Sequence, residues 1–157
     1  MEVLHMDYEA LLDEACKEGL VVKEKPLKYN DGRIKGKRIA IRHNLSTSVE
    51  KACVLAEELG HYHTAVGNIL NQNTVANRKQ EHRARVWAYR DAFDLVDLVS
   101  AYKYGCKNRY EIAEYLDITE TFLSDALEHY KSQYGLYTKV DKYLVYFEPL
   151  GVLELSL

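Results

Sequence analysis

The residues best suited to chemistry are two carboxylates and a histidine within one turn, in the segment Ala56-Glu57-Glu58-Leu59-Gly60-His61. Zinc peptidases carry H-E-x-x-H on a helix, where histidines four residues apart bind the metal and the glutamate activates a metal-bound water. In this chain Glu57 stands at the place of the first histidine and His61 at the second. The spacing therefore predicts a metal-binding pair, Glu57 and His61, with Glu58 as the general base.

The same turn can be explained without a metal. An amphipathic helix has a charged, solvated face, which two carboxylates and a histidine would also form. Gly60 favours the metal site, because a glycine inside a helix costs roughly 1 kcal/mol relative to alanine. Such a glycine is tolerated where another element packs closely, and a second ligand-bearing helix would be such an element.

A second helix of the right kind follows in the run Glu81-His82-Arg83-Ala84-Arg85-Val86-Trp87-Ala88. Its alanines, Ala84 and Ala88, would let the two helices approach each other. Trp87 would pack beneath the site, and Glu81 is the candidate third ligand. The alternative is an exposed Glu81 that pairs with Arg85 one turn later, a contact worth a few tenths of a kcal/mol.

Three segments of the chain together resemble the ImmA/IrrE metallopeptidases, proteins of bacteria, phages and mobile elements. They are the helix at residues 56–61, the preceding strand at 38–41 and the helix at 81–88. The resemblance extends over most of the chain, including a two-helix unit at 108–133 and the tail through Pro149. Members of that family typically carry H-E-L-G-H with a downstream glutamate, and they are implicated in cleaving helix-turn-helix repressors.

Matched position by position, the resemblance implies that Glu57, His61 and Glu81 bind the metal and that Glu58 is the catalytic base. It also implies a helix-turn-helix repressor of a phage or mobile element as the protein partner. The fold that it implies is α+β: a mainly helical, zincin-like metalloprotease domain with a small antiparallel sheet and a C-terminal helical pair.

The glutamate at position 57 departs from the family pattern. One imidazole and two carboxylates neutralise a metal's charge more fully than two imidazoles and one carboxylate, so bound water should be less acidic. Zinc should also be less favoured over Mn²⁺ or Fe²⁺, although zinc remains the first expectation. The chain is then an active endopeptidase, a weak one, or an antirepressor that binds without cleaving. His63 or His82 could supply a further nitrogen, but His63 would point away from His61 on a regular helix.

Two features raise the alternative of a DNA-binding regulator. The basic cluster at residues 33–38 is a local argument for nucleic acid, but a charged edge strand that limits aggregation explains it as well. The strand at 39–42 could instead offer an exposed edge to an extended substrate segment. The two-helix unit at 108–133 has helix-turn-helix spacing. Its second helix is acidic, however, with Glu120, Asp125 and Glu128, so we do not expect it to contact DNA.

Composition sets the broad class. The chain has 157 residues, 47% of them hydrophobic and 29% charged, which are values of a globular protein. The net charge of −3 provides no overall basic field to attract nucleic acid. We find neither a signal-peptide pattern at the start nor an apolar run of about 20 residues for a membrane span. Three well-separated cysteines without a C-x-x-C pair agree with a cytoplasmic address. The resemblance implies that this is the cytoplasm of a bacterial host cell.

The pattern along the chain predicts one domain over 1–157, with a metal-binding core at 1–105 and a helix-turn-helix-like unit with a terminal strand at 106–157. Thr47 should cap the motif helix with Glu50 in a capping box. The other expected elements are a helix at 8–18, a strand at 20–22, a hairpin or edge strand at 33–42, a loop at 64–73, a helix at 74–104 interrupted near residue 91 or 100, and a strand at 143–147 ended by Pro149.

Overall fold

The computed structural model describes residues 6–65 and 74–156. Residues 66–73, most of the segment for which the sequence predicts a loop, lie outside the described residues. The chain divides into two compact units, Met6–Asp91 and the residues from Ala92 onward. Helix α4, which we expected in the first part of the chain, belongs to the second unit.

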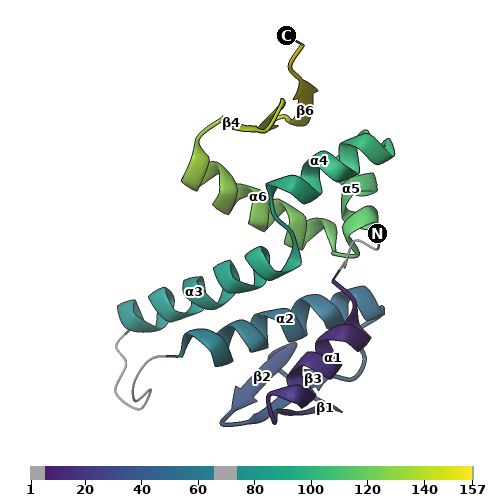
Figure 1. Cartoon of the computed structure of the whole chain (residues 1–157). Coiled ribbons are helices and arrows are strands. Elements are labelled where there is room, and N and C mark those ends of the chain that lie inside the picture. The colour runs from purple at the N-terminus through teal and green to yellow at the C-terminus, as the bar shows by residue number, and fades with distance from the viewer. Residues whose placement is uncertain (1–5, 66–73, 157) are drawn as a thin grey trace. The chain divides into compact units, whose positions relative to one another are not determined.

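The unit Met6–Asp91 combines three helices with a three-stranded sheet (Figure 1). Its elements are α1 (Tyr8–Lys17), β1 (Val21–Lys25), β2 (Gly32–Lys35), β3 (Arg38–Arg42), α2 (Ser48–Thr64) and α3 (Thr74–Ala92), whose last residue falls in the second unit. Thr47 caps the motif helix α2, which confirms this half of the predicted capping box: the Thr47 Oγ1 accepts a hydrogen bond from the Glu50 backbone N–H at 3.1 Å. This contact satisfies one of the unpaired N–H groups of the first turn.

The sheet differs from the expected antiparallel one, because it is mixed. The strand order is β1-β3-β2, in which β1 pairs with β3 in parallel and β2 pairs with β3 in antiparallel fashion. β3 is therefore the central strand, and the expectation that residues 39–42 offer an exposed edge is wrong. The register explains the arrangement: Ile39 lies between Val22 of β1 and Ile34 of β2, which gathers three apolar side chains on the face covered by helices.

The second unit contains three helices and a separate antiparallel sheet. Its elements are α4 (Leu95–Tyr104), α5 (Arg109–Leu116), α6 (Glu120–Tyr134), β4 (Tyr137–Val140), β5 (Tyr143–Phe147) and β6 (Leu150–Glu154). The expected interruption of the long helix near residue 91 is confirmed. It falls between α3 and α4, where Asp94 and Asp97 form a reciprocal capping box.

The C-terminal sheet is larger than the single strand that the sequence predicts. β5 is the centre of the order β4-β5-β6, and Pro149 lies in the turn between β5 and β6 instead of ending the sheet. Gly151 of β6 makes room for a cross-strand neighbour, since a Cβ at this position would lie 2.5 Å from the ring of Tyr146. α6 buries Phe122 and Leu123 among other residues, so the helix-turn-helix-like pair is a packed part of this unit.

The α+β class is confirmed, with six helices and two three-stranded sheets in the described part of the chain. Within the same residues, no helix combines the length and the apolar character that crossing a bilayer would require.

Candidate metal centre

The candidate site is built where α2 and α3 come into close contact. At Gly60, an added Cβ would lie 2.2 Å from the backbone carbonyl oxygen of Ala84, a distance that no side chain could occupy. Ala84 and Ala88 are both fully buried. The prediction that a glycine and two alanines allow close packing of these helices is therefore confirmed. Glycine lowers the intrinsic stability of helix α2, but its missing side chain is what allows the two helices to come into contact.

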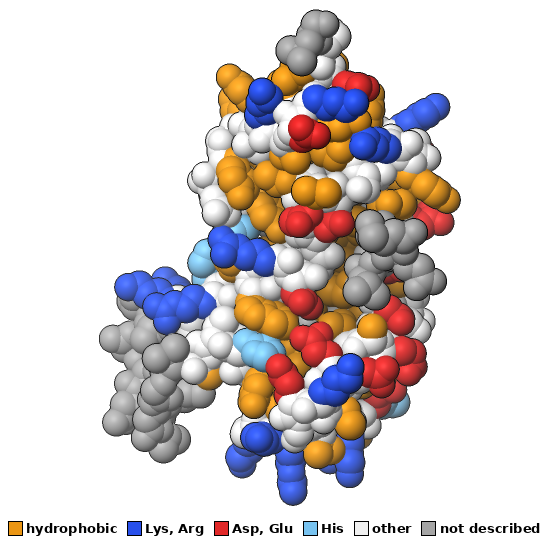
Figure 2. Space-filling view, viewed as in Figure 1, with side chains coloured by type: hydrophobic (Ala, Val, Ile, Leu, Met, Phe, Trp, Pro, Cys, Tyr) orange, Lys and Arg blue, Asp and Glu red, His pale blue; other side chains and the backbone are white. Residues whose placement is uncertain are grey.

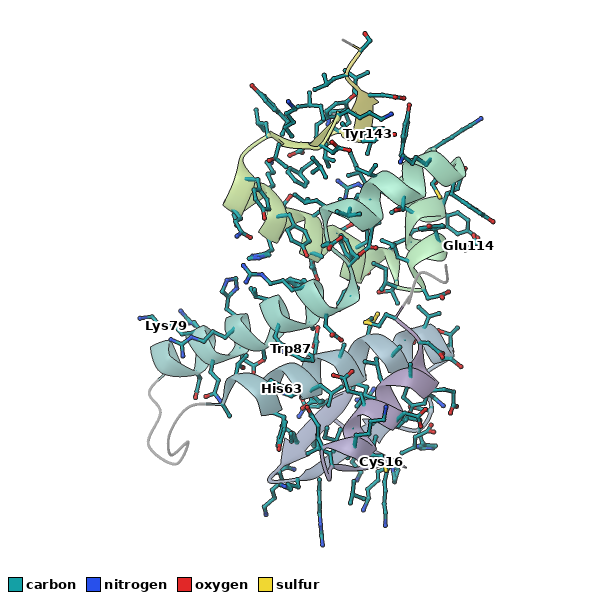
Figure 3. All side chains as sticks on the ribbon, in the orientation of Figure 1. Cys16, His63, Lys79, Trp87, Glu114 and Tyr143 are labelled. Atoms are coloured by element: carbon teal, nitrogen blue, oxygen red, sulfur yellow. The ribbon has the colours of Figure 1, made fainter. Side chains whose placement is uncertain are left out.

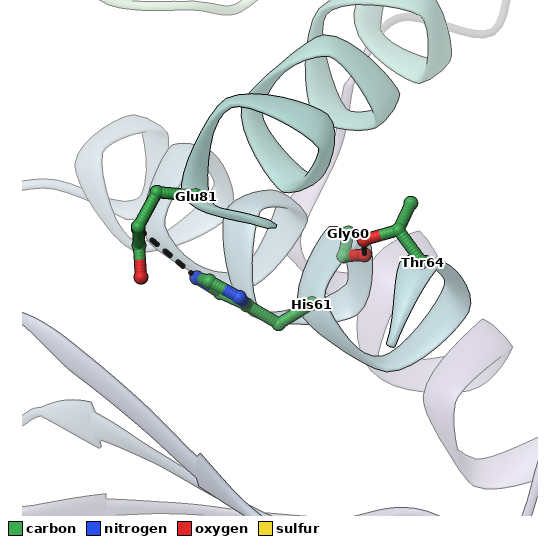
Figure 4. Close-up of polar contacts among 4 residues, drawn as sticks. All are labelled: Gly60, His61, Thr64 and Glu81. Carbon is green, nitrogen blue, oxygen red and sulfur yellow. Dashed lines mark hydrogen bonds and ion pairs between the residues drawn. The ribbon is translucent and has the colours of Figure 1, made fainter. Parts of the chain in front are cut away.

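Close packing brings together two of the predicted ligands from different helices. The Nε2 of His61 on α2 lies 3.4 Å from the Oε2 of Glu81 on α3 (Figure 4). This distance is long for a charge-assisted hydrogen bond, which falls at about 2.7–2.9 Å. Two ligands of a tetrahedral zinc, each bound at about 2.0–2.1 Å, lie roughly 3.4 Å apart. The pair thus has a separation that suits a shared metal.

Glu58 is the one charged residue buried among the described residues, with 9% of its surface exposed. Its carboxylate faces Gly32 of β2, where an added Cβ would lie 2.9 Å from Oε1 and 2.6 Å from a methyl group of Val54. Burial, followed by the nearby charges of Glu57 and Glu81, raises the pKa of Glu58 from 4.5 to about 7. Burial has the largest effect, because an ionised carboxylate loses the stabilisation that water would give it. The two like charges further disfavour the ionised form.

Glu57 lies on α2 one turn before His61 and is partly buried. The negative charges of Glu57 and Glu81 both raise the pKa of Glu58, so the three carboxylates lie close enough to interact electrostatically. Over residues 6–65 and 74–156, however, Glu57 does not complete a group with His61 and Glu81 in which all ligand atoms lie within 4.8 Å of one another. A rotation of its side chain would be needed for three-point binding. His82, the alternative ligand on α3, is exposed.

A different group of potential metal ligands is compact, and the sequence did not lead us to it. Ligand atoms of Glu14, Glu18 and His63 all lie within 4.8 Å of one another. His63 Nε2 is 3.0 Å from Glu18 Oε2, and the imidazole stacks on the ring of Trp87, with 4.7 Å between ring centroids and 17° between planes (Figure 3). The expectation that His63 points away from His61 is confirmed. Trp87 supports His63, where we had expected it beneath the candidate metal site.

The Glu14–Glu18–His63 group needs no metal to account for it. It is a cluster of ionisable side chains that links the C-terminal end of α1 to α2. Burial raises the pKa of Glu14 and that of Asp91, and His63 partly offsets both shifts. The i, i+4 spacing of Glu14 and Glu18 was the available sequence signal, since it places two carboxylates on one helix face. Sequence alone could not place His63 opposite them, because the contact depends on how α1 packs against α2.

The two groups differ in what they can do chemically. Beside His61 and Glu81 stands a buried carboxylate that can exchange a proton near neutral pH. No protein-family model matches this chain, nor does any curated protein or solved structure.

Proposed function

We propose that this protein is a metal-dependent endopeptidase of the ImmA/IrrE type. Its substrate would be a helix-turn-helix transcriptional repressor of a phage or mobile element, and its place of action the cytoplasm of the bacterial host. The observation that carries the proposal is the buried Glu58, whose pKa is raised to about 7, beside a His61–Glu81 pair held at 3.4 Å. A general base works best when its pKa lies near the operating pH.

The donor set fits a divalent metal. His61 and Glu81 have the separation of two ligands that share an ion, and Glu57 on the adjacent turn would be the third after a side-chain rotation. An ion bound there would supply a Lewis acid for the scissile carbonyl and for the attacking water. Zinc is the first candidate, with Mn²⁺ or Fe²⁺ as alternatives because two of the three ligands are carboxylates.

Glu58 would handle the proton. Its carboxylate is held between helix α2 and Gly32 of β2, so it has little freedom to turn away from the site. With a pKa near neutrality it can accept a proton from water and later donate it to the leaving amine. Glu57 and Glu81 would tune this exchange, since both lie close enough to raise the pKa of Glu58.

A second function is favoured by Glu57, which replaces the family's first histidine and stands outside a compact ligand group. On this reading the chain would bind the repressor and relieve repression without cleaving it. The fold and the partner would be the same, and only the chemical step would be lost.

Metal analysis combined with Glu58→Gln separates these functions. The purified wild-type protein should contain about one divalent ion per chain and should cleave a helix-turn-helix repressor encoded beside its gene. Glu58→Gln should keep the ion and the fold and lose cleavage, whereas Glu50→Gln, the same chemical change on the same helix, should cleave normally. If neither wild type nor Glu58→Gln cleaves but both relieve repression in cells, the binding function is correct. Equal cleavage by wild type and Glu58→Gln would refute the role of Glu58.

A further inference from the structure

The mixed sheet of the Met6–Asp91 unit has one face packed on helices and one basic face. α1 contacts β1, and α2 contacts β2 and β3. Ile39 and Ile41 of β3 are buried on that side. Side chains alternate between the two faces of a strand, so the register assigns the opposite face. That face carries two basic residues from each strand: Lys23 and Lys25 of β1, Arg33 and Lys35 of β2, and Arg38 and Arg42 of β3.

No acidic residue of these three strands shares the basic face, whose two other positions are Val21 and Ala40. The acid of β1, Glu24, pairs in register with the buried Ile41, and its carboxylate lies 2.5 Å from Lys51 of α2. Figure 2 shows several Lys and Arg side chains projecting at the bottom of the view, with Asp and Glu side chains directly above them. The chain therefore has a locally basic face although its net charge is −3.

Two pairings on the basic face place like charges directly opposite each other. Lys35 of β2 pairs with Arg38 of β3, and Lys25 of β1 pairs with Arg42. Like charges in directly opposed positions destabilise a sheet. Asp31 partly offsets one pair, at 3.4 Å from Arg42.

Edge protection does not account for this face. Charged residues on an edge strand prevent pairing with another chain, and β2 and β1 are the edges of this sheet. Arg38 and Arg42 lie on the central strand, where there is no edge to protect. A polyanionic partner would explain why positive charge is accumulated across all three strands.

We propose that the basic face binds the phosphate backbone of duplex DNA without reading its sequence. Basic side chains here recur about every 6.8 Å along a strand and about 4.8 Å between strands, which gives a dense grid for phosphates. The face has no aromatic side chain on which the bases of a single strand could stack and no amide to read base edges. With only Val21 and Ala40 as apolar members it has little to insert into a bilayer. The acidic α6, the basis for not expecting DNA contact, is no part of this face.

The test is binding of a fluorescent duplex of about 20 base pairs at salt concentrations from about 50 to about 200 mM. Wild type should bind, with log K falling linearly with log salt by about 0.9 for each phosphate contact. Lys23→Gln/Lys35→Gln should reduce that slope by about 2 and weaken binding about tenfold at the lowest salt. The control Lys107→Gln/Lys139→Gln changes net charge equally through exposed lysines of the other unit, and it should bind like wild type.

Stability provides an independent readout. Lys35→Gln removes one member of the opposed pair with Arg38, so its melting temperature should equal or exceed that of wild type while its DNA affinity falls. Absence of binding by wild type, or equal loss in the control, would overturn the proposal. So would binding to phosphatidylserine vesicles without binding to DNA, or equal displacement of DNA by polyglutamate. The inference does not depend on the proposed protease, and Glu58→Gln should bind DNA as wild type does.

Discussion

The backbone carbonyl oxygen of Ala84 lies 2.2 Å from the point where a Cβ on residue 60 would sit. The oxygen belongs to the backbone of α3 and cannot turn away as a side chain could. Gly60 therefore fixes how near α2 can come to α3, and with it the 3.4 Å separation of His61 and Glu81.

Gly60→Ala should destabilise the protein and weaken metal binding together. Overpacking of a tight interface typically costs about 1–3 kcal/mol, and here the helices must also move apart. Urea unfolding gives the first effect and metal titration the second. Ala84→Gly should not rescue the variant, because the obstructing atom is a carbonyl oxygen that glycine also has. Full rescue would show that the contact lies elsewhere.

The stability of the metal-free protein should fall as the pH rises from about 4.5 to about 7. The folded state holds the proton of Glu58 up to about pH 7 and the unfolded chain releases it near 4.5, so the folded state binds more protons in this window. The contribution is complete below pH 4.5 and is lost as the pH passes 7, by at most about 3 kcal/mol.

Urea midpoints at about pH 5 and about pH 8, in the presence of a chelator, measure this contribution. Glu58→Gln should flatten the dependence. Glu14→Gln is the control, because the pKa of Glu14 is also raised by burial. This variant should lose only the pH dependence that Glu14 contributes and keep that of Glu58. A wild-type midpoint that rises between these pH values would contradict the prediction.

Glu57→His should raise zinc affinity and keep proteolysis at least as strong as in wild type. The change would replace a negative ligand by a neutral one, so an ion held there would polarise water more strongly and the pH profile of cleavage would move to lower pH. Zinc titration of both proteins under matched conditions is the measurement. Indistinguishable affinities would mean that Glu57 is not a ligand.

The two histidines of the α2 C-terminal turn should respond differently to removal. His61→Ala should abolish binding of the single divalent ion, because it leaves only carboxylate ligands. His63→Ala should retain the ion and lower stability, since it breaks the contacts with Glu18 and Trp87. The metal content of both purified variants decides this, and loss of the ion only in His63→Ala would transfer the metal site to the Glu14–Glu18–His63 group.

Sequence reasoning succeeded where local signals coincide. The Thr47 cap, the close approach at Gly60 and the break before α4 each depend on neighbouring residues or on a residue type with one structural use. It failed where pairing is long-range. The parallel partner of β3 and the flanking strands of β5 are chosen by tertiary packing, which short polar and apolar runs do not encode.

The candidate site was predictable to a similar degree. Spacing and helix pairing led to His61 and Glu81, which the structure places close together. The burial of Glu58 could not be read from the motif, because it results from β2 crossing the carboxylate at Gly32. The placement of His63 against Glu18 and Trp87 likewise depends on the packing of three helices.

The contact between Gly32 and Glu58 also has a consequence for how the chain folds. If β2 slipped by one residue along β3, either Asp31 or Arg33 would take the place of Gly32, against Val54 and the carboxylate. Asp31 would bring a second negative charge, Arg33 would not fit, and the slip would also turn Ile34 out of the core. One missing side chain thus makes the misregistered hairpin unstable and leaves a single alignment of the β2–β3 pair available to the folding chain.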